Sequence, residues 1–459
     1  MCSLMLSPQK IRTGVPARAY STRGFPLLKP LALTAVVFFS VSGGPYGLEP
    51  LLNLVGARNG FLLILWTPIF WAIPVILMVL ELNGMMPRTG GYYQWVRAGL
   101  GHMWGFLEGW WTWEYMFVDL AIYPVLFVEY ASFFFPSIAA YRYLLCLTII
   151  WSCAGLNLLG ILPVGRGSIT FGFLVILPFL VLYAFAFHAG FSLPHSDHIV
   201  GSAVPTRTAF GLGLFTVMWN FLGWDNVSTF AEEVDRPVRS YLVAMIAAFI
   251  LILVTYALAI IAASDANVDP EKLELEGFPL LGQIVGGAGV GALISVGGMA
   301  SALGLFGANL LSVSRLPKAM ADDGLLPHAL SRVGSRHGVP HVSIITCATI
   351  VSIMVLWRFE DLLIIDVMLY GCALFLEFAA LIALRRLMPN ATRPFRIPLS
   401  QSGLLALFVC PILCFTSGVV ALVAKQSPHM GALIFATSAL LAGPLFWLVE
   451  KRTRFRSTR

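Results

Sequence analysis

Carboxylate side chains inside otherwise apolar segments are the residues of this 459-residue chain best placed to do chemistry. A charged side chain at the centre of a bilayer costs about 2.5 kcal/mol or more, so such an acid faces a wet cavity, pairs with a cation or holds a proton. The interiors of the same segments contain no Lys or Arg, which favours a cationic ligand. Eight of these acids are Glu49, Glu108, Glu114, Asp119, Glu129, Asp225, Asp366 and Glu377.

The spacing of the acids indicates which of them act together. Glu108 and Asp119 are eleven residues apart, which is three turns along one helix face, or about 16 Å. A long diamine can therefore contact more than one acid. We expect Asp119 and Asp225 to contact ammonium groups, with Asp119 as the first and Glu114 as the second candidate for a coupled proton. Glu377 is either a site residue or a hydrogen bonder between packed helices.

Other candidate ligand contacts have an alternative structural role. Glu49 lies toward the predicted outer surface, and it either contacts the substrate or is simply solvated. Tyr46, Tyr123 and Trp224 either offer aromatic faces to ammonium groups or pack in the core.

Two apolar segments are interrupted at equivalent places. Residues 42–47 (SGGPYG) contain three glycines and a proline, and residues 220–226 (NFLGWDN) contain polar groups and a glycine. Broken helices leave unpaired amides and carbonyls, which a membrane tolerates only where they line a cavity. Transporters built from inverted repeats place their binding site between such a pair of breaks. We therefore expect Ser42, Gly43, Gly44 and Asn220 at the site.

Composition identifies the elements that must position these residues. The chain is 58% hydrophobic and 11% charged, against roughly a quarter charged in soluble proteins, which excludes a disordered chain or a nucleic-acid binder and predicts an all-α protein in a lipid bilayer. The apolar runs predict about twelve spans, near 31–55, 60–83, 104–131, 141–161, 168–189, 208–231, 240–264, 285–314, 340–358, 361–384, 403–424 and 430–449.

The basic residues predict the orientation. Counted in alternate loops, one side holds 23 Lys and Arg residues and the other side 6 of the total of 29. Because cytoplasmic loops are rich in Lys and Arg, both termini are predicted to be cytoplasmic. The first 29 residues contain five basic residues and no acid; they read as a cytoplasmic tail, with an organelle transit peptide as the alternative. The plasma membrane is the expected location.

Enzymatic chemistry is not predicted. Six of the seven cysteines lie in apolar runs without CxxC spacing, and no HExxH occurs. We therefore expect no metal, no cofactor and no catalytic residue.

Several motifs carry a resemblance to a known family. Residues 41–49 (VSGGPYGLE), 119–129 (DLAIYPVLFVE), 219–235 (WNFLGWDNVSTFAEEVD), 320–327 (MADDGLLP) and 369–378 (LYGCALFLEF) resemble the polyamine and cationic amino-acid transporters of the amino acid/polyamine/organocation superfamily. Residues 87–95 (PRTGGYYQW) are general to the superfamily. The resemblance covers about residues 25–450. It implies a leucine-transporter-like fold of five plus five inverted helices with two peripheral helices, and proton-coupled uptake.

These observations predict a secondary transporter that imports polyamines or related cationic amines and amino acids with protons by alternating access. A permease for neutral amino acids is the alternative, with the Gly43 and Gly44 amides holding a carboxylate. The predicted organisation is a basic tail (1–29), a first repeat (30–190), a second repeat (208–386), two further spans (400–450) and a second tail (451–459).

Overall fold

The computed structural model describes residues 27–190, 192–194, 206–235, 237–334, 337–356, 359–423 and 430–457. Most of the predicted N-terminal tail and of the 190–207 loop lies outside these residues. Within them the protein is helical, with one isolated bridge between Leu28 and Val234.

Eight helical segments of the described part are long and apolar enough to cross a membrane. They are formed by α3 (Glu49–Phe70) with α4 (Ala72–Met85), α6 (His102–Ser132), α8 (Ile161–Ala189), α10 (Pro237–Asp265), α13 (Ala288–Val313) with α14 (Arg315–Asp322), α16 (Phe359–Leu387), α17 (Gln401–Leu422) and α18 (Met430–Ser457).

Shorter elements account for the remaining apolar runs. They are α2 (Pro30–Val41), α7 (Arg142–Leu158), α15 (His341–Met354), and α9 (Thr206–Trp219) followed by the 3₁₀ helix η2 (Asn226–Glu233). Each of the twelve predicted runs is thus helical over most of its length, and the predicted all-α membrane fold is confirmed. The division into inverted repeats stays a prediction.

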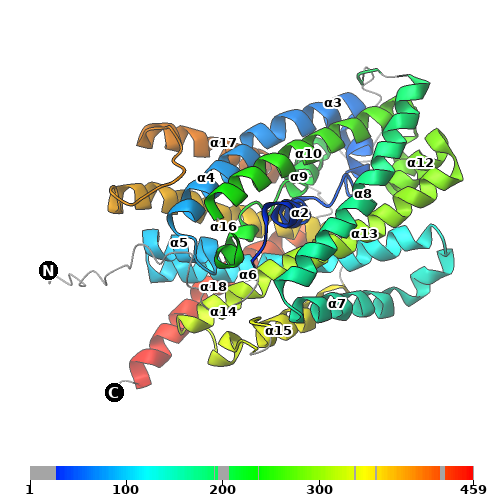
Figure 1. Ribbon diagram of the computed structural model, residues 1–459. Helices are drawn as coiled ribbons and strands as arrows, with labels where there is room; N and C mark the ends of the chain where they lie inside the picture. Colours follow the sequence, from blue (N-terminus) through cyan, green and yellow to red (C-terminus); the bar gives the residue numbers. More distant parts are fainter. Residues whose placement is uncertain are drawn as a thin grey trace.

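Short helices outside the spans mark the two ends of the bundle. Helix α5 (Gly91–Leu100) and α14 lie at one end, here called the α5 end, and α12 (Phe278–Gly286) lies at the opposite α12 end (Figure 1). Helix α11 (Pro270–Glu276) directly precedes α12. Two 3₁₀ turns, η1 (Pro136–Tyr141) and η3 (His328–Ser331), complete the elements.

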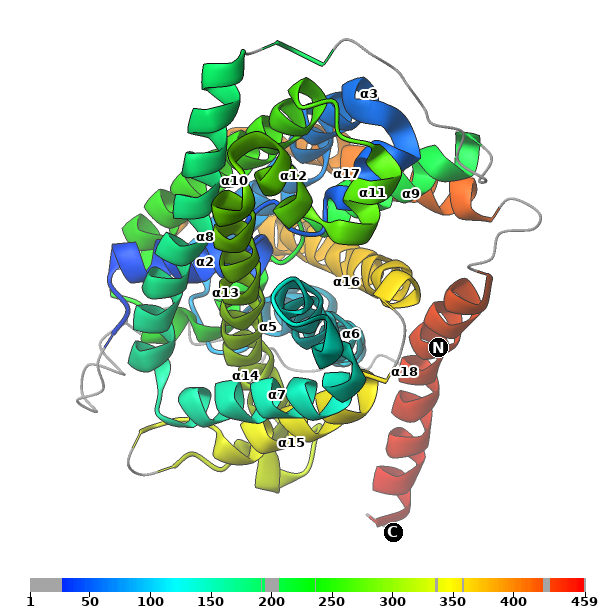
Figure 2. The same ribbon diagram turned by 90° about the vertical axis from the view of Figure 1, so that its right-hand side faces the viewer.

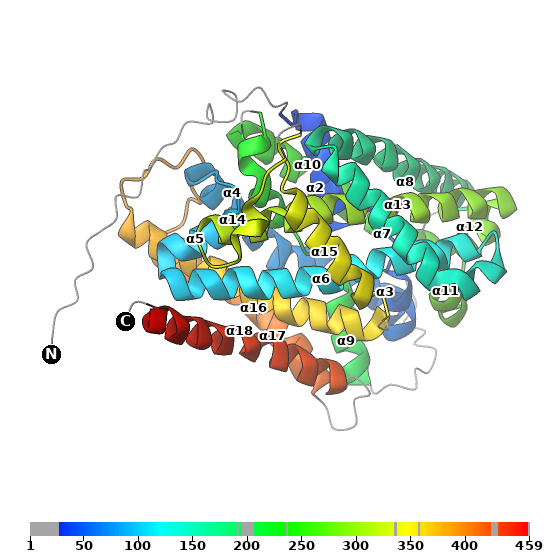
Figure 3. The same ribbon diagram turned by 90° about the horizontal axis from the view of Figure 1, so that it is seen from below.

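The outer helices present apolar side chains to the surroundings. Phe173 on α8 is 73% exposed, and Leu441 and Leu445 on α18 are also exposed. Helix α18 runs along the edge of the bundle (Figures 2 and 3), where it packs on α6 and α16. Large exposed apolar side chains on a long helix suit contact with lipid rather than water.

The glycines of residues 87–95 hold α5 against η2. A Cβ atom on Gly91 would lie 1.9 Å from the Ser228 hydroxyl, and the Gly90 amide donates to the Thr229 carbonyl at 2.9 Å. Farther along α5, Tyr93 donates to Asp323 at 2.7 Å. Burial, and secondarily this hydrogen bond, raise the pKa of the Tyr93 phenol, which keeps it a donor.

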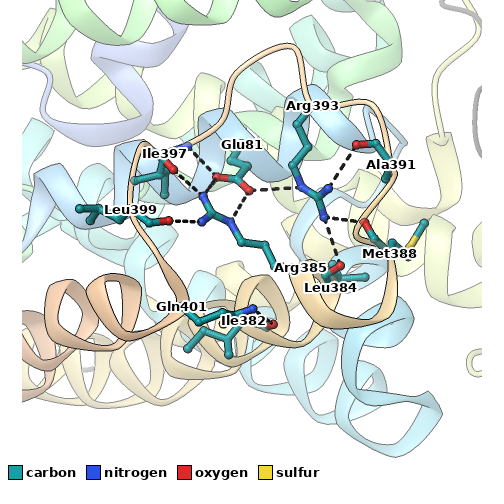
Figure 4. Close-up of polar contacts among 10 residues, drawn as sticks. All are labelled: Glu81, Ile382, Leu384, Arg385, Met388, Ala391, Arg393, Ile397, Leu399 and Gln401. Carbon is teal, nitrogen blue, oxygen red and sulfur yellow. Dashed lines mark hydrogen bonds and ion pairs between the residues drawn. The ribbon is translucent and has the colours of Figure 1, made fainter.

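A buried ion cluster closes the α5 end between α4 and α16 (Figure 4). Glu81 accepts two hydrogen bonds from Arg385, at 2.8 and 2.5 Å, and lies 3.3 Å from Arg393. Its Oε2 also accepts from the Ile397 amide at 2.8 Å. Sequence reasoning did not select Glu81, since its partner is 304 positions away in the chain. The cluster ties the ends of two spans to the loop after α16.

Candidate functional site

The two predicted interruptions meet in the middle of the bundle. Helix α2 ends at Val41 and α3 begins at Glu49, while α9 ends at Trp219 and η2 begins at Asn226. Gly223 has φ +85°, and a Cβ there would lie 2.2 Å from the Ser40 carbonyl oxygen. The chain therefore needs glycine where the second break presses against α2.

Tyr256 of α10 joins the two breaks. Its hydroxyl donates to the Ser42 hydroxyl at 2.6 Å and lies 3.2 Å from both the carbonyl and the side-chain oxygen of Asn220. The Ser42 hydroxyl also accepts from the Gly44 amide at 2.9 Å. Polar atoms freed by the breaks are thus paired within the protein, as a membrane interior requires.

A small cavity lined by buried residues lies beside the breaks. Its volume is about 20 Å³, about enough for one water molecule. Its polar lining comes from α2, α6, the α9–η2 break and α16: Ser40, Ser42, Tyr115, Asp119, Tyr123, Trp219, Asn220, Asn226 and Asp366.

Several hydrogen bonds hold the Asp119 carboxyl in this cavity. Tyr123 donates to its carboxyl with both oxygens 2.6 Å away, and the Asn309 amide donates at 2.9 Å. The Trp219 indole lies beside both Asp119 and Asp366 in this cavity, and the two carboxyls repel each other when both are charged. All of these partners are neutral or acidic, and Asp119 is 8% exposed. Two buried carboxyls therefore share a cavity whose described lining contains no Lys or Arg.

Asp225 belongs to a neighbouring acid cluster. The Tyr370 hydroxyl donates to its Oδ1 at 2.6 Å. The Glu377 side chain also contacts the Asp225 carboxyl, and the Glu108 carboxyl is near enough to repel it when both are charged. The structure thus groups Asp225 with Glu377 rather than with Asp119.

Other predicted site residues lie outside the cavity. Tyr46 donates to the Ile294 carbonyl at 2.6 Å and packs on Tyr130. Trp224 is fully buried and its ring is 6.1 Å from Phe249 of α10. Both rings pack in the core, and their contact with ammonium groups stays a prediction.

Glu114, Gly43 and Gly44 are not among the residues that line the cavity. Glu114 accepts from the Trp110 indole at 2.8 Å. Five residues from Asp119, it projects about 140° around the helix from it. The two glycines have φ +69° and +106° and pack against Leu305 and Val175 respectively.

Glu49 lies at the start of α3 and contacts Tyr130, which lines a wider opening at the α12 end. It is 5% exposed, so the solvated alternative is wrong. It accepts from the Tyr130 hydroxyl at 2.9 Å and from the Gly47 amide at 2.6 Å. Tyr130 also lines a vestibule of about 340 Å³ together with two further acids, Glu129 and Glu276. Three acids therefore lie near the α12 end, and one of them, Glu49, contacts the first break through Gly47.

Sequence reasoning missed Asn309, Tyr256 and the pairing of Asp366 with Asp119. Their signal was a polar or phenolic side chain inside an apolar run, which marks a buried hydrogen bonder without naming its partner.

Comparisons with known proteins agree with the motif resemblance. The model of the amino acid permease family matches residues 28–443. Polyamine transporter RMV1 of Arabidopsis thaliana is 31% identical over 458 residues, covering 94% of this chain and 92% of that protein. Polyamine transporter PUT1 of Oryza sativa subsp. japonica is 30% identical over 436 residues, covering 93% and 79%. An uncharacterized transporter of Legionella pneumophila is 26% identical over 387 residues, covering 75% and 79%.

Proposed function

The chain belongs to the amino acid permease family, and from this premise we propose that it imports polyamines or related cationic amines and amino acids by alternating access, coupled to protons. Similar proteins of two plants are named polyamine transporters. The family and these names make the protein a transporter; the substrate, direction and coupling are our proposal.

One observation carries the choice of a cationic substrate. The central cavity has two facing carboxyls, Asp119 and Asp366, and its described lining has no basic side chain. A buried carboxylate without a counter-charge is costly. An ammonium group supplies that counter-charge and donates hydrogen bonds to the acids. A neutral amino acid would bring its own carboxylate into the same acidic space.

The small size of the cavity supports alternating access. At about 20 Å³ the cavity is too small for an amine of several carbons. Binding therefore requires the elements around it to separate, and the non-helical breaks beside it are places where a helix can bend. We propose that the vestibule at the α12 end admits the substrate and that release follows opening at the α5 end.

Uptake into proteoliposomes tests the proposal. The purified full-length protein is reconstituted and challenged with labelled putrescine, spermidine, arginine and leucine at two pH values. We expect saturable uptake of the amines, inhibited by one another and increased when the entry side is more acidic. Uptake of leucine without uptake of any cation would replace this proposal by the neutral amino-acid alternative.

A further inference from the structure

Helices α6 and α16 carry the same polar pattern in opposite directions. Along α6, Glu108 is followed by Tyr115 seven residues later and by Asp119 after four more. Along α16, Asp366 is followed by Tyr370 four residues later and by Glu377 after seven more. Steps of four, seven and eleven residues return to nearly the same face of a helix, so each triplet lines one face.

The two triplets face each other as three rungs. Asp119 and Asp366 line the central cavity together. The rings of Tyr115 and Tyr370 are perpendicular, with centroids 5.2 Å apart. The carboxyls of Glu108 and Glu377 are near enough to repel each other when both are charged. Helices α6 and α16 pack side by side (Figure 2). Each triplet covers eleven residues of helix. The Asp119–Asp366 pair, here called the outer rung, therefore lies about 16 Å from the Glu108–Glu377 pair, here called the inner rung.

The inner rung has unused hydrogen-bonding capacity. Glu108 Oε2, Glu377 Oε2 and the Tyr92 hydroxyl are buried with no hydrogen-bond partner among the described residues. Tyr92 is 0% exposed and acts electrostatically with Glu108, Asp225 and Glu377. Among the described residues, the groups acting on these three carboxyls are acids, hydroxyls and backbone groups rather than Lys or Arg. A cation with several N–H donors would supply the missing counter-charge and the missing hydrogen bonds to these carboxyls and this hydroxyl.

We propose that Glu108, Asp225, Glu377 and Tyr92 form a second ammonium subsite, so that a long polyamine is held extended with one terminal ammonium at each acid rung. This inference rests on the proposed function and adds a preference for substrates long enough to reach both acid rungs. The Tyr115–Tyr370 pair forms the middle rung, where its rings contact the alkyl chain of the polyamine and any ammonium group between the two terminal ones.

Chain length then decides how many subsites a substrate fills. An extended chain gains about 1.2 Å per bond, taking three bonds per residue of extended backbone. Spermine has thirteen bonds between its terminal nitrogens and spans about 16 Å on this scale. Putrescine has five bonds and spans about 6 Å, which confines it to one rung.

The test compares amines of different length on the purified full-length protein. Binding of spermine and putrescine is measured for wild type and for Glu377→Gln, with Glu114→Gln as the matched control. Loss of the inner charge should weaken spermine binding by about 10–100-fold, the range for a charged hydrogen bond. Putrescine binding should change by less than about twofold, and the control variant should match wild type for both amines.

A second measurement uses wild-type protein alone, so it does not depend on the folding of a variant. Diamines of four to twelve carbons are compared with monoamines of equal length on wild-type protein. The diamine affinity should rise steeply near the length that spans both rungs, beyond the gradual rise of the monoamines. Parallel rises for the two series, or an equal loss of spermine and putrescine in Glu377→Gln, would overturn the second subsite while leaving the proposed function standing. Failure of every amine to bind would reject both.

Discussion

Asp119 combines burial, two neutral hydrogen-bonding partners and an acidic neighbour. The Tyr123 and Asn309 bonds orient the carboxyl, and Asp366 across the cavity adds like charge. This arrangement stabilises the position of the carboxyl without neutralising it. Neutralisation is left to a ligand or a proton.

The first prediction removes that charge and keeps the shape. Asp119→Asn and Asp366→Asn should each weaken binding of a cationic amine by about 1.5–3 kcal/mol, the range for a hydrogen bond to a charged group. Equilibrium binding of labelled putrescine to purified protein is measured at alkaline pH, where Asp119 carries its charge and is not already neutralised by a proton.

The control for this prediction lies on the same helix. Glu114→Gln removes a carboxylate that accepts a hydrogen bond from Trp110 rather than from a cavity residue, so its amine affinity should equal that of wild type. Unchanged affinity in both cavity variants would take these acids out of the binding site.

At the scale of elements, the broken helices depend on side chains from unbroken ones. Tyr256 on α10 reaches Ser42 and Asn220, one from each break. The residues before α2 also pair with the end of η2, through Leu28 N to Glu233 O and Asp235 N to Leu28 O, both at 3.0 Å. The two interrupted segments are therefore joined at their middles and at one end.

The second prediction tests the joint at the middle. Tyr256→Phe leaves buried acceptors of both breaks without their donor, which should cost about 1–3 kcal/mol of folding free energy. Unfolding of the detergent-solubilised protein by heat gives the measurement. Tyr141→Phe is the control, because the Tyr141 ring is 64% exposed. Equal stability of the two variants would show that the bridge contributes nothing.

The third prediction concerns the ion cluster between α4 and α16. Glu81→Gln leaves Arg385, which is 8% exposed, without its counter-charge, and breaking a buried pair typically costs about 3–5 kcal/mol. Asp322→Asn breaks the exposed pair with Lys318 instead and should cost about 0.5 kcal/mol or less. A smaller thermal destabilisation for Glu81→Gln than for Asp322→Asn would contradict the buried lock.

Local signals and long-range pairings differ in how far sequence reveals them. The breaks at 42–47 and 220–226 could be predicted because glycine, proline and polar groups interrupt an apolar run locally. The pairing of Asp119 with Asn309 spans 190 positions, and helix rotation and packing decide it. Helical periodicity alone would have rejected Glu114 as a neighbour of Asp119, whereas the burial of Trp224 against Phe249 required the structure.

At the scale of the whole molecule, the bundle has two chemically different ends. The α5 end has the Glu81–Arg385 cluster and the ion pairs of Arg315 with Glu233 and Arg97 with Asp323. The α12 end has the acidic vestibule. The excess of basic residues in the loops of the α5 end favours the cytoplasm for that side.

The fourth prediction tests this orientation. On a background without the seven cysteines, Lys272→Cys at the α12 end should react with an impermeant thiol reagent added outside cells. Arg332→Cys at the α5 end should react only after the membrane is permeabilised. Both positions are exposed, so access rather than burial decides the labelling. The reverse pattern would invert the topology.

The fifth prediction concerns the proton. An ammonium bound at Asp366 leaves the charge of Asp119 uncompensated in a closed cavity, and a proton on Asp119 removes it. A loaded carrier with less buried net charge crosses its closed state at lower cost, which is the energetic reason for coupling. An inward pH gradient across proteoliposomes should therefore drive accumulation of labelled amine. At saturating substrate, Asp119→Asn should retain exchange of amine across the membrane and lose the part driven by the gradient. Accumulation that ignores pH and follows sodium, or an Asp119→Asn carrier that still concentrates amine, would assign coupling to another ion or another residue.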